Sequence, residues 1–215
     1  KKDFRRARVV SVLDPSPDRT TPPCRHFLEG CGGCDWQHAT VEGQRRYKLD
    51  VLRDALRRIA HIDNPPFSEI RGVTPADYRT TIRAVADAEG RLGFRKRRSE
   101  QVIATPECLV ADRLVRAVLA TATFPPNSQI IVRASVAQGT TVVSSIDDEV
   151  GATQREEVGG SGWEVSPSSF FQSGPQAAEL LVETVVAAVG RFHGLEPIQV
   201  LDAYAGIGIL GGAVL

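Results

Sequence analysis

Four cysteines constrain how this chain can fold more than any other feature. Three of them form Cys24-x6-Cys31-Gly-Gly-Cys34, and 73 residues separate Cys34 from Cys108. Thiolates are soft metal ligands, and a Cys-x2-Cys turn presents two sulfurs to one metal without strain. If all four share a site, the fold must return Cys108 to the cysteine loop. The spacing alone favours structural zinc over an iron–sulfur cluster, and disulfides or unliganded thiols remain a third alternative.

The cysteine count also bears on the class of protein. Four cysteines among 215 residues are too few for the disulfide framework of a small secreted domain. With 42% hydrophobic and 24% charged residues, the chain can build one or two globular domains with a real core. No apolar run is long enough to span a membrane, and the chain does not open with a signal-peptide pattern. We therefore expect a cytoplasmic protein, working as a monomer.

The net charge of zero conceals two halves of opposite sign. Residues 1–116 hold 23 Lys and Arg against 16 Asp and Glu, whereas residues 117–215 hold 3 against 10. A polyanion such as RNA would be attracted to the first half and repelled by the second. The densest basic cluster is Arg95-Lys96-Arg97-Arg98, although any single cluster of this kind is more often a solvated surface. The segregation of charge predicts a polyanionic partner.

Hydrophobic periodicity and turn residues predict a mixed chain of helices and strands. We expect helices over about 40–60, 110–121 and 175–189, with Thr40 as an N-cap and Pro175 at a helix start. The cysteine-rich stretch 20–38 and the acidic, glycine-rich stretch 147–162 are expected to be loops. Strands are expected over residues 7–13, 80–87, 91–96, 101–104, 129–137, 141–146 and 198–202.

A glycine-rich turn follows the last expected strand. Gly206, Gly208 and Gly211 spell G-x-G-x-x-G, the turn that lets a nucleotide cofactor approach the backbone. Asp202, at the strand end, would repel a pyrophosphate but suits the positive charges of S-adenosylmethionine. The turn therefore favours S-adenosylmethionine over a nicotinamide dinucleotide, with a tight turn that binds no ligand as the structural alternative.

Six short segments, taken together, point to one family. The segments are Cys24…Cys31-Gly-Gly-Cys34-x3-His38, Tyr78-Arg79, Leu92-Gly93-Phe94-Arg95, Pro106-Glu107-Cys108, Ser169-Phe170-Phe171-Gln172 and Asp202-Ala203-Tyr204-Ala205-Gly206-Ile207-Gly208. In this order they resemble the iron–sulfur RNA uracil-5-methyltransferases, which make 5-methyluridine in 23S ribosomal RNA. The resemblance covers nearly the whole chain.

This resemblance implies a site and a domain layout. It implies a [4Fe–4S] cluster in place of zinc, and S-adenosylmethionine bound by Gln172 and Tyr204, with Gly206 and Gly208 allowing its close approach. The expected fold is an α+β central domain carrying the four-cysteine cluster loop, followed by the start of an α/β Rossmann-like methyltransferase domain. The implied cluster ligands are Cys24, Cys31, Cys34 and Cys108. The implied domains are residues 1–19, the last strand and exit of an N-terminal β-barrel, 20–165, the central domain, and 166–215, the incomplete methyltransferase domain.

The resemblance further implies a reaction. Members of the family add a Cys thiolate to uracil C6, which lets C5 accept the methyl group, and a base then removes the C5 proton. The family's nucleophilic Cys and general-base Glu have no counterpart here, so we expect a catalytically incomplete piece of a longer enzyme. Gly174 and Ala205 replace the Asn and Cys that are frequent in the family. We expect both positions to affect loop conformation and to take no part in the chemistry.

Other functions remain open alongside this one. The RNA substrate could be transfer RNA instead of ribosomal RNA. A zinc-bearing RNA-binding module without methyl transfer would reduce the glycine turn to packing. A Rossmann-type enzyme for a small molecule would leave the basic half of the chain unexplained. Iron content distinguishes the zinc-bearing module from the methyltransferase, and RNA binding distinguishes the small-molecule enzyme from it.

Overall fold

The computed structural model describes residue 7 and residues 9–67, 70–146, 152–166, 169–192 and 199–214. By its contacts the chain forms two compact units: Lys1–Pro23 with Asp35–Phe67, and Cys24–Cys34 with Ser68–Leu215. The cysteine loop therefore belongs to the second unit, although the residues on either side of it belong to the first. The division into three domains expected from the resemblance stays a prediction.

The first unit is built around α2 (Val41–Ile59), which confirms the helix expected over 40–60. The Thr40 hydroxyl caps it by accepting a hydrogen bond from the Gly43 amide at 3.1 Å. Asp18 lies against the first turns and accepts a hydrogen bond from the Tyr47 hydroxyl at 2.8 Å. Neither α2 nor any other helix in the described part of the chain is long and apolar enough to cross a bilayer.

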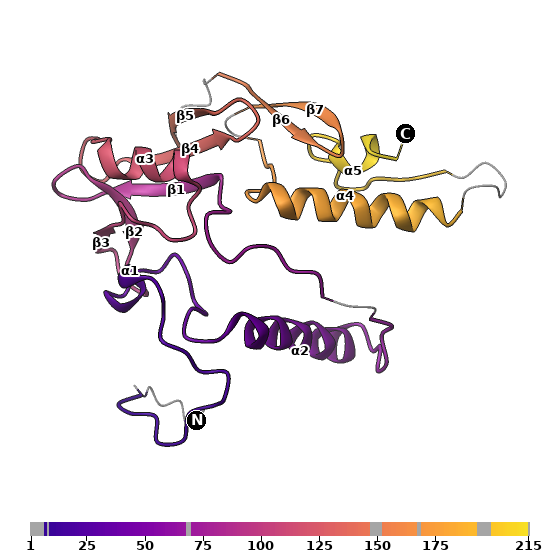
Figure 1. The fold of residues 1–215 in the computed structure, drawn as a ribbon, viewed down its shortest axis with the longest axis horizontal. Coiled ribbons are helices and arrows are strands. Elements are labelled where there is room, and N and C mark those ends of the chain that lie inside the picture. The colour runs from indigo at the N-terminus through magenta and orange to yellow at the C-terminus, as the bar shows by residue number, and fades with distance from the viewer. Residues whose placement is uncertain are drawn as a thin grey trace, which may run out of the picture. The chain divides into compact units, whose positions relative to one another are not determined.

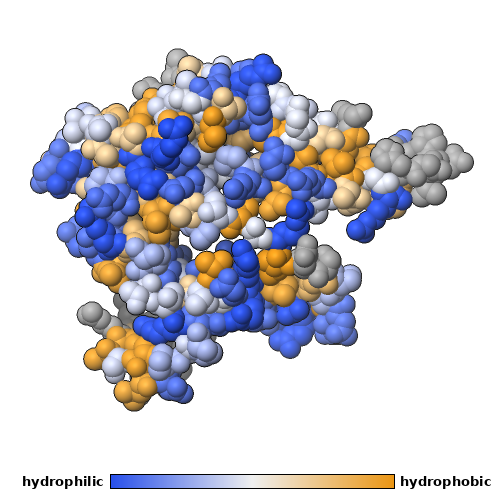
Figure 2. All heavy atoms as spheres, in the orientation of Figure 1, coloured by the Kyte–Doolittle hydropathy of each residue, from blue (hydrophilic) through white to orange (hydrophobic). Residues whose placement is uncertain are grey.

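The strand expected over residues 7–13 is not formed at Ala7 or at residues 9–13, which is a correction. Val9, Val10 and Leu13 are 76%, 95% and 94% exposed, and this segment is the hydrophobic patch at the lower left of Figure 2. A strand is stabilised by hydrogen bonds to a neighbour, and these residues pair with none in the described structure. The barrel remnant stays a prediction.

The second unit contains an antiparallel sheet of five strands in the order β3-β2-β1-β4-β5 (Figure 1). All five strands fall where the sequence predicts strands. Residues distant in sequence pair across the centre of this sheet, with Thr81 opposite Arg133. The strands are β1 (Thr81–Ala86), β2 (Leu92–Arg95), β3 (Val102–Ala104), β4 (Gln129–Ser135) and β5 (Thr140–Ser145).

One helix, α3 (Arg113–Thr121), covers this sheet and confirms the helix expected over 110–121. The Asp112 carboxylate caps it by accepting a hydrogen bond from the Leu114 amide at 2.8 Å. Its apolar side buries Val115 and Leu119 in the same core as the sheet residues Leu92 and Val132. This core also contains Cys108, so the fourth cysteine is fixed by packing as well as by any ligand.

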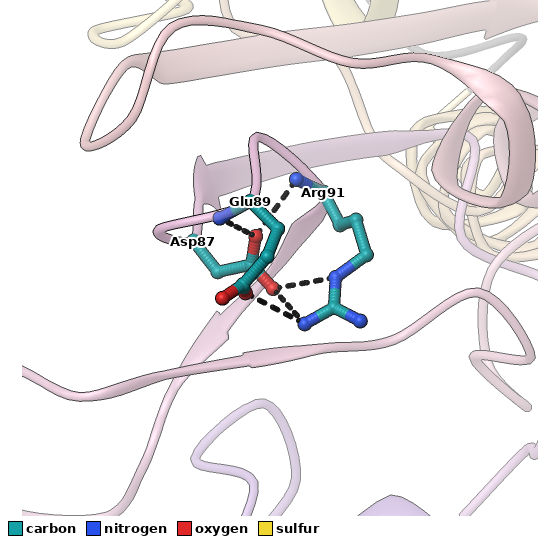
Figure 3. A network of polar contacts seen from close by, with 3 residues as sticks. All are labelled: Asp87, Glu89 and Arg91. Atoms are coloured by element: carbon teal, nitrogen blue, oxygen red, sulfur yellow. Dashed lines mark hydrogen bonds and ion pairs between the residues drawn. The ribbon is translucent and has the colours of Figure 1, made fainter.

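The turn between β1 and β2 is closed by a network of charged groups (Figure 3). The Asp87 carboxylate accepts hydrogen bonds from the Glu89 amide at 3.0 Å and from the Arg91 amide at 2.8 Å. The Arg91 guanidinium binds the same carboxylate through Nε at 2.9 Å and also pairs with Glu89. Burial alone would raise the pKa of Asp87, but its hydrogen bonds from Arg91 hold that pKa below its usual value. The network is a structural turn that fixes the register of the two strands.

The prediction of a loop over residues 147–162 is wrong for its second part, which begins a β-hairpin. Strands β6 (Gln154–Val158) and β7 (Ser161–Val165) pair around Gly159 and Gly160. Both glycines have positive φ, at 63° and 73°, which a two-residue hairpin turn requires. Burial alternates along β6, so one face of this strand is packed and the other is exposed. Residues 147–151 of the expected loop lie outside the described residues.

The hairpin packs on α4 (Pro175–Gly190), whose first residue confirms the expected helix start. A second apolar core forms here from Val158, Val165, Phe171, Ala178 and Val182.

The prediction of a strand over residues 198–202 is also wrong for the residues that the structure describes. Ile198 lies outside the described residues, and residues 199–202 form no strand. Val200 and Leu201 are 56% and 89% exposed. A central parallel strand needs neighbours on both edges, and the described chain places none beside this segment. The glycine turn that follows leads into the short helix α5 (Ile209–Gly212).

Candidate functional site

Cys24, Cys34 and Cys108 lie close enough to Cys31 to influence its thiol. None of the four is in a disulfide, and Cys24, Cys31 and Cys108 are buried. Burial raises the pKa of the Cys31 thiol, the Gly33 amide opposes this by donating to its Sγ at 3.4 Å, and the other three thiols raise it further. Soft donors gathered in this way fit a thiophilic metal or cluster.

The ligating geometry itself is not formed. Over the described ranges, which include all four cysteines, no group of three or more His, Cys, Asp or Glu side chains is arranged to hold a metal ion. Burial raises the pKa of the Cys108 thiol, and the backbone amides of Ala111 and Val110 oppose this shift only in part. The assignment of the four ligands stays a prediction.

The cysteine loop is joined to the hairpin between β2 and β3. It begins with α1 (Arg25–Leu28), a short helix that the sequence did not predict. The Gly32 amide donates to the Arg95 carbonyl at 2.9 Å, and the Arg97 amide donates to the Gly30 carbonyl at 3.0 Å. A Cβ on Gly32 would lie 2.8 Å from the Arg95 carbonyl oxygen, so this close approach requires glycine.

One cation of the basic cluster, Arg97, serves this joint. The Arg97 guanidinium donates to the Cys34 carbonyl at 3.0 Å and lies 3.9 Å from the centroid of the Phe27 ring. The Arg95 guanidinium pairs with Glu100 at 2.8 Å. Arg97 thus holds the cysteine loop, while Arg95 pairs with a residue that follows it in its own hairpin.

The segment Ser169–Gln172, where the resemblance places a cofactor contact, lies beside the five-stranded sheet. The Arg133 guanidinium donates from Nη2 to the Ser169 carbonyl at 2.6 Å. The Thr80 amide donates to the Ser173 carbonyl at 2.7 Å. Gln172 is half-buried between these two attachments.

The glycine turn has the backbone that its sequence indicates. Gly206 and Gly208 have φ of 57° and 86°, in the left-handed region that favours glycine. The Tyr204 amide donates to the Asp202 carboxylate at 3.3 Å, while the Tyr204 side chain is 97% exposed. The turn is formed, but the tyrosine expected to contact the cofactor is not part of an enclosed site.

The two expected cofactor segments share the second apolar core. Phe171, next to Gln172, is buried in it, and Ile207 and Ile209 from the glycine turn pack against it. The structure thus brings the neighbours of Gln172 and of Gly208 onto one small core, and it leaves Tyr204 outside. The assignment of Gln172, Tyr204, Gly206 and Gly208 to the cofactor stays a prediction.

A buried polar cluster next to Ser169 was missed by the sequence analysis. Arg133, Ser135, Gln154 and Glu156 are 4%, 0%, 2% and 6% exposed. Burial raises the pKa of Glu156 to about 7, against the opposing effects of the Arg133 charge and the Ser135 hydroxyl. An arginine inside the apolar run Gln129-Ile-Ile-Val-Arg133 was the available signal, because such a charge is buried only with a specific role.

The chain is similar in sequence to proteins that are named as RNA methyltransferases. No model of a known protein family matches the chain. An uncharacterized RNA methyltransferase of Streptomyces coelicolor is 30% identical over 98% of this chain and 55% of its own length. One from Corynebacterium glutamicum is 30% identical over 97% of this chain and 56% of its own length. The chain spans about half the length of these curated relatives, which are RNA methyltransferases.

Two further comparisons concern uracil. The 23S rRNA (uracil(1939)-C(5))-methyltransferase RlmD of Halomonas elongata is 38% identical over 51% of this chain and 23% of its own length. The crystal structure of Pyrococcus abyssi tRNA (uracil-54, C5)-methyltransferase in complex with S-adenosyl-L-homocysteine has a TM-score of 0.62. It covers 94% of this chain and 57% of the solved chain at 17% identity, so it establishes a shared mixed α/β fold.

Proposed function

We propose that the protein containing this chain transfers a methyl group from S-adenosylmethionine to uracil C5 in RNA, with 23S ribosomal RNA as substrate. The observation that carries the proposal is similarity to RNA methyltransferases over 98% of the chain. The 38% identity to a 23S rRNA uracil-C5 methyltransferase supports the choice of base and RNA. The proposed protein acts in the cytoplasm as a monomer.

In this proposal C5 becomes nucleophilic through a covalent adduct. A Cys thiolate adds to C6, the C5 carbon takes the methyl group, a base removes the C5 proton, and the thiolate leaves. S-adenosylmethionine supplies the methyl group, and Gln172, Tyr204, Gly206 and Gly208 are the residues of this chain assigned to its binding. None of the four cysteines is available as the nucleophile if all four hold a cluster.

The activity test uses the complete gene product with tritiated S-adenosylmethionine and unmodified RNA transcripts. The proposal expects label in 5-methyluridine of 23S ribosomal RNA. Transfer to transfer RNA alone would support the second candidate, a tRNA uracil-5 methyltransferase, whose fold the chain shares. Absence of transfer to either RNA, by protein that is folded and loaded with its metal, would contradict the proposed function.

The four cysteines are proposed to hold a [4Fe–4S] cluster that stabilises the second unit. The nearness of the other three thiols to Cys31 and the Gly33 amide that donates to its sulfur support this assignment. Protein purified without air should contain about four iron atoms and be brown. One zinc with no iron would instead favour the RNA-binding module that lacks methyl transfer. Cys108→Ser should lower the thermal midpoint of the second unit and its iron content together.

RNA is proposed to bind the basic half, and the hairpin cluster gives a sharp test of this surface. Lys96→Gln together with Arg98→Gln should reduce the slope of log K against log salt by about two units, one for each phosphate contact. Arg95, which pairs with Glu100, supplies the control, because Arg95→Gln should change the slope less. An unchanged slope in the double variant would show that this hairpin does not contact RNA.

A further inference from the structure

Arg133 places a charged group inside the second unit. It lies in β4 and is only 4% exposed. Burying a guanidinium is unfavourable unless its charge and donors are satisfied. Burial lowers its pKa, and the Glu156 carboxylate on β6 acts in the opposite direction, so the charge is partly balanced. A residue this costly to bury must be explained by what it contacts.

The contact is the backbone of the segment that contains Gln172. Arg133 Nη2 lies 2.6 Å from the carbonyl oxygen of Ser169, 36 residues away in sequence. A hydrogen bond from a charged donor is stronger than one between neutral groups. Because it reaches a carbonyl instead of a side chain, it fixes the path of the chain at Ser169.

A second attachment comes from the adjacent strand. Thr81 is paired with Arg133 in the sheet, and the preceding residue, Thr80, donates its amide to the Ser173 carbonyl at 2.7 Å. Thr80 itself is 4% exposed and accepts a hydrogen bond from the Ala134 amide at 2.8 Å. Residues 169–173 are thus held at one end by Arg133 of β4 and at the other by Thr80, which directly precedes β1.

We infer that Arg133 is a positioning residue for S-adenosylmethionine, because its hydrogen bond to Ser169 fixes the segment from which Gln172 reaches the cofactor. The inference rests on the proposed function, since it takes Gln172 as a cofactor contact. A segment that is ordered before its ligand arrives loses less conformational entropy on binding. One buried side chain, together with the Thr80 backbone attachment, therefore links the five-stranded sheet to the cofactor site.

The choice of arginine follows from the geometry. A guanidinium keeps its charge when buried and presents its donors in a rigid plane, whereas a lysine ammonium is a single point on a flexible stem. Arg133→Lys can keep the charge opposite Glu156 but loses the planar donor. It should therefore show an intermediate effect, and Arg133→Met should show the full effect.

The experiment compares Arg133→Met, Arg133→Lys and Arg83→Met in the complete gene product. Arg83 is an exposed arginine on the neighbouring strand β1 and serves as the matched control. Calorimetry with S-adenosylhomocysteine should give a dissociation constant about 10-fold higher for Arg133→Met, a smaller rise for Arg133→Lys and none for Arg83→Met. Hydrogen exchange should accelerate in peptides covering residues 169–173, and RNA affinity should stay within about twofold of wild type.

Three outcomes would overturn the inference, and they differ in what else they contradict. Unchanged cofactor affinity in Arg133→Met, with binding by wild type intact, would remove the positioning role alone. A parallel loss of cofactor and RNA binding would show that Arg133 serves only the general stability of the fold. Wild-type protein that binds no S-adenosylhomocysteine would contradict the proposed function, and the assignment of Gln172 would fail with it.

Discussion

The five-stranded sheet and the glycine turn both contain glycines matched to the same family, yet the structure holds them in different ways. Gly93 lies in β2, where a Cβ would meet the Ile103 carbonyl oxygen at 1.8 Å. Gly206 has positive φ and no atom within 4 Å of where its Cβ would be. The glycine of the sheet is required by a neighbouring strand, and the glycine of the turn is required by its own backbone.

This difference extends to the apolar residues of the two regions. Leu92, beside Gly93, is fully buried, whereas Leu201, shortly before the turn, is 89% exposed. Pairings between distant residues fix the sheet, while the turn is fixed by local hydrogen bonds such as that from the Gly208 amide to the Ala205 carbonyl at 2.8 Å. Substitutions in the sheet should therefore affect the whole second unit, and substitutions in the turn should act locally.

The largest difference is expected between the two glycines. Gly93→Ala should destabilise the second unit by about 4 kcal/mol or more, because a backbone carbonyl cannot move aside without breaking the pairing of β2 and β3. Gly206→Ala should cost only about 1 kcal/mol, the strain of a left-handed alanine. Urea unfolding followed by circular dichroism measures both. Equal effects would show that the sheet is not the better fixed of the two regions.

The paired leucines test the same contrast through packing. Leu92→Ala should lower the free energy of unfolding by about 3 kcal/mol, because it leaves a cavity in the core shared with Val115 and Val132. Leu201→Ala, at an exposed position, should change it by less than about 0.5 kcal/mol. A substantial loss in Leu201→Ala would reveal packing around the glycine turn that the described residues do not show.

Glu156, on β6, interacts with Arg133 and Ser135 of the sheet, and its effect on stability should depend on pH. Its pKa of about 7 in the folded protein lies above its ordinary value of 4.5. Between these values the folded protein keeps a proton that the unfolded chain releases. The stability due to the neutral carboxyl is therefore complete below about pH 4.5 and is lost as the pH rises through about 7.

Glu156→Gln stays neutral throughout, so its stability relative to wild type should rise between pH 5 and pH 8 by at most about 3 kcal/mol. Thermal unfolding over this pH range is the measurement. Glu157→Gln, on the exposed side of the same strand, is the control and should follow the wild-type profile. A difference between Glu156→Gln and wild type that is independent of pH would contradict the assignment.

The smallest effect concerns the helix starts of the two regions. Asp112→Ala should cost about 1 kcal/mol, because it leaves the Leu114 amide of α3 without its cap. The start of α5 at Gly208 has no side-chain cap to lose. Asp112→Asn, which keeps an acceptor oxygen, should retain most of the stability, and an equal loss in both variants would argue against a capping role.

The sequence predicted the sheet well because its signals are local and agree with one another. The apolar residues of β1 and β4 and the turn residues between the strands each indicate one structure. It failed for β6 and β7, where acidic side chains and glycines outweighed the alternation that marks a half-buried strand. The Gly159-Gly160 pair was the signal for that hairpin.

The expected strands at 7–13 and 198–202 failed for another reason. Their composition suits a strand, but a strand forms only beside a partner, and composition does not say where the partner is. The candidate site shows the same limit. Motif residues such as Cys31 and Gln172 could be found from the sequence, whereas Arg133 could not, because its role depends on contact with a residue 36 positions away.

The joint between the cysteine loop and the β2–β3 hairpin has a consequence for the newly made chain. The backbones of Cys31 and Lys96 pair in an isolated antiparallel β-bridge, and 65 positions separate these residues. At roughly 5–20 residues per second, a ribosome needs roughly 3–13 seconds to make the hairpin after the loop has been made. During that interval the first three thiols have no hairpin to dock on. They are then accessible to oxidants and to stray metal ions, and Cys108 is not yet present to complete the set.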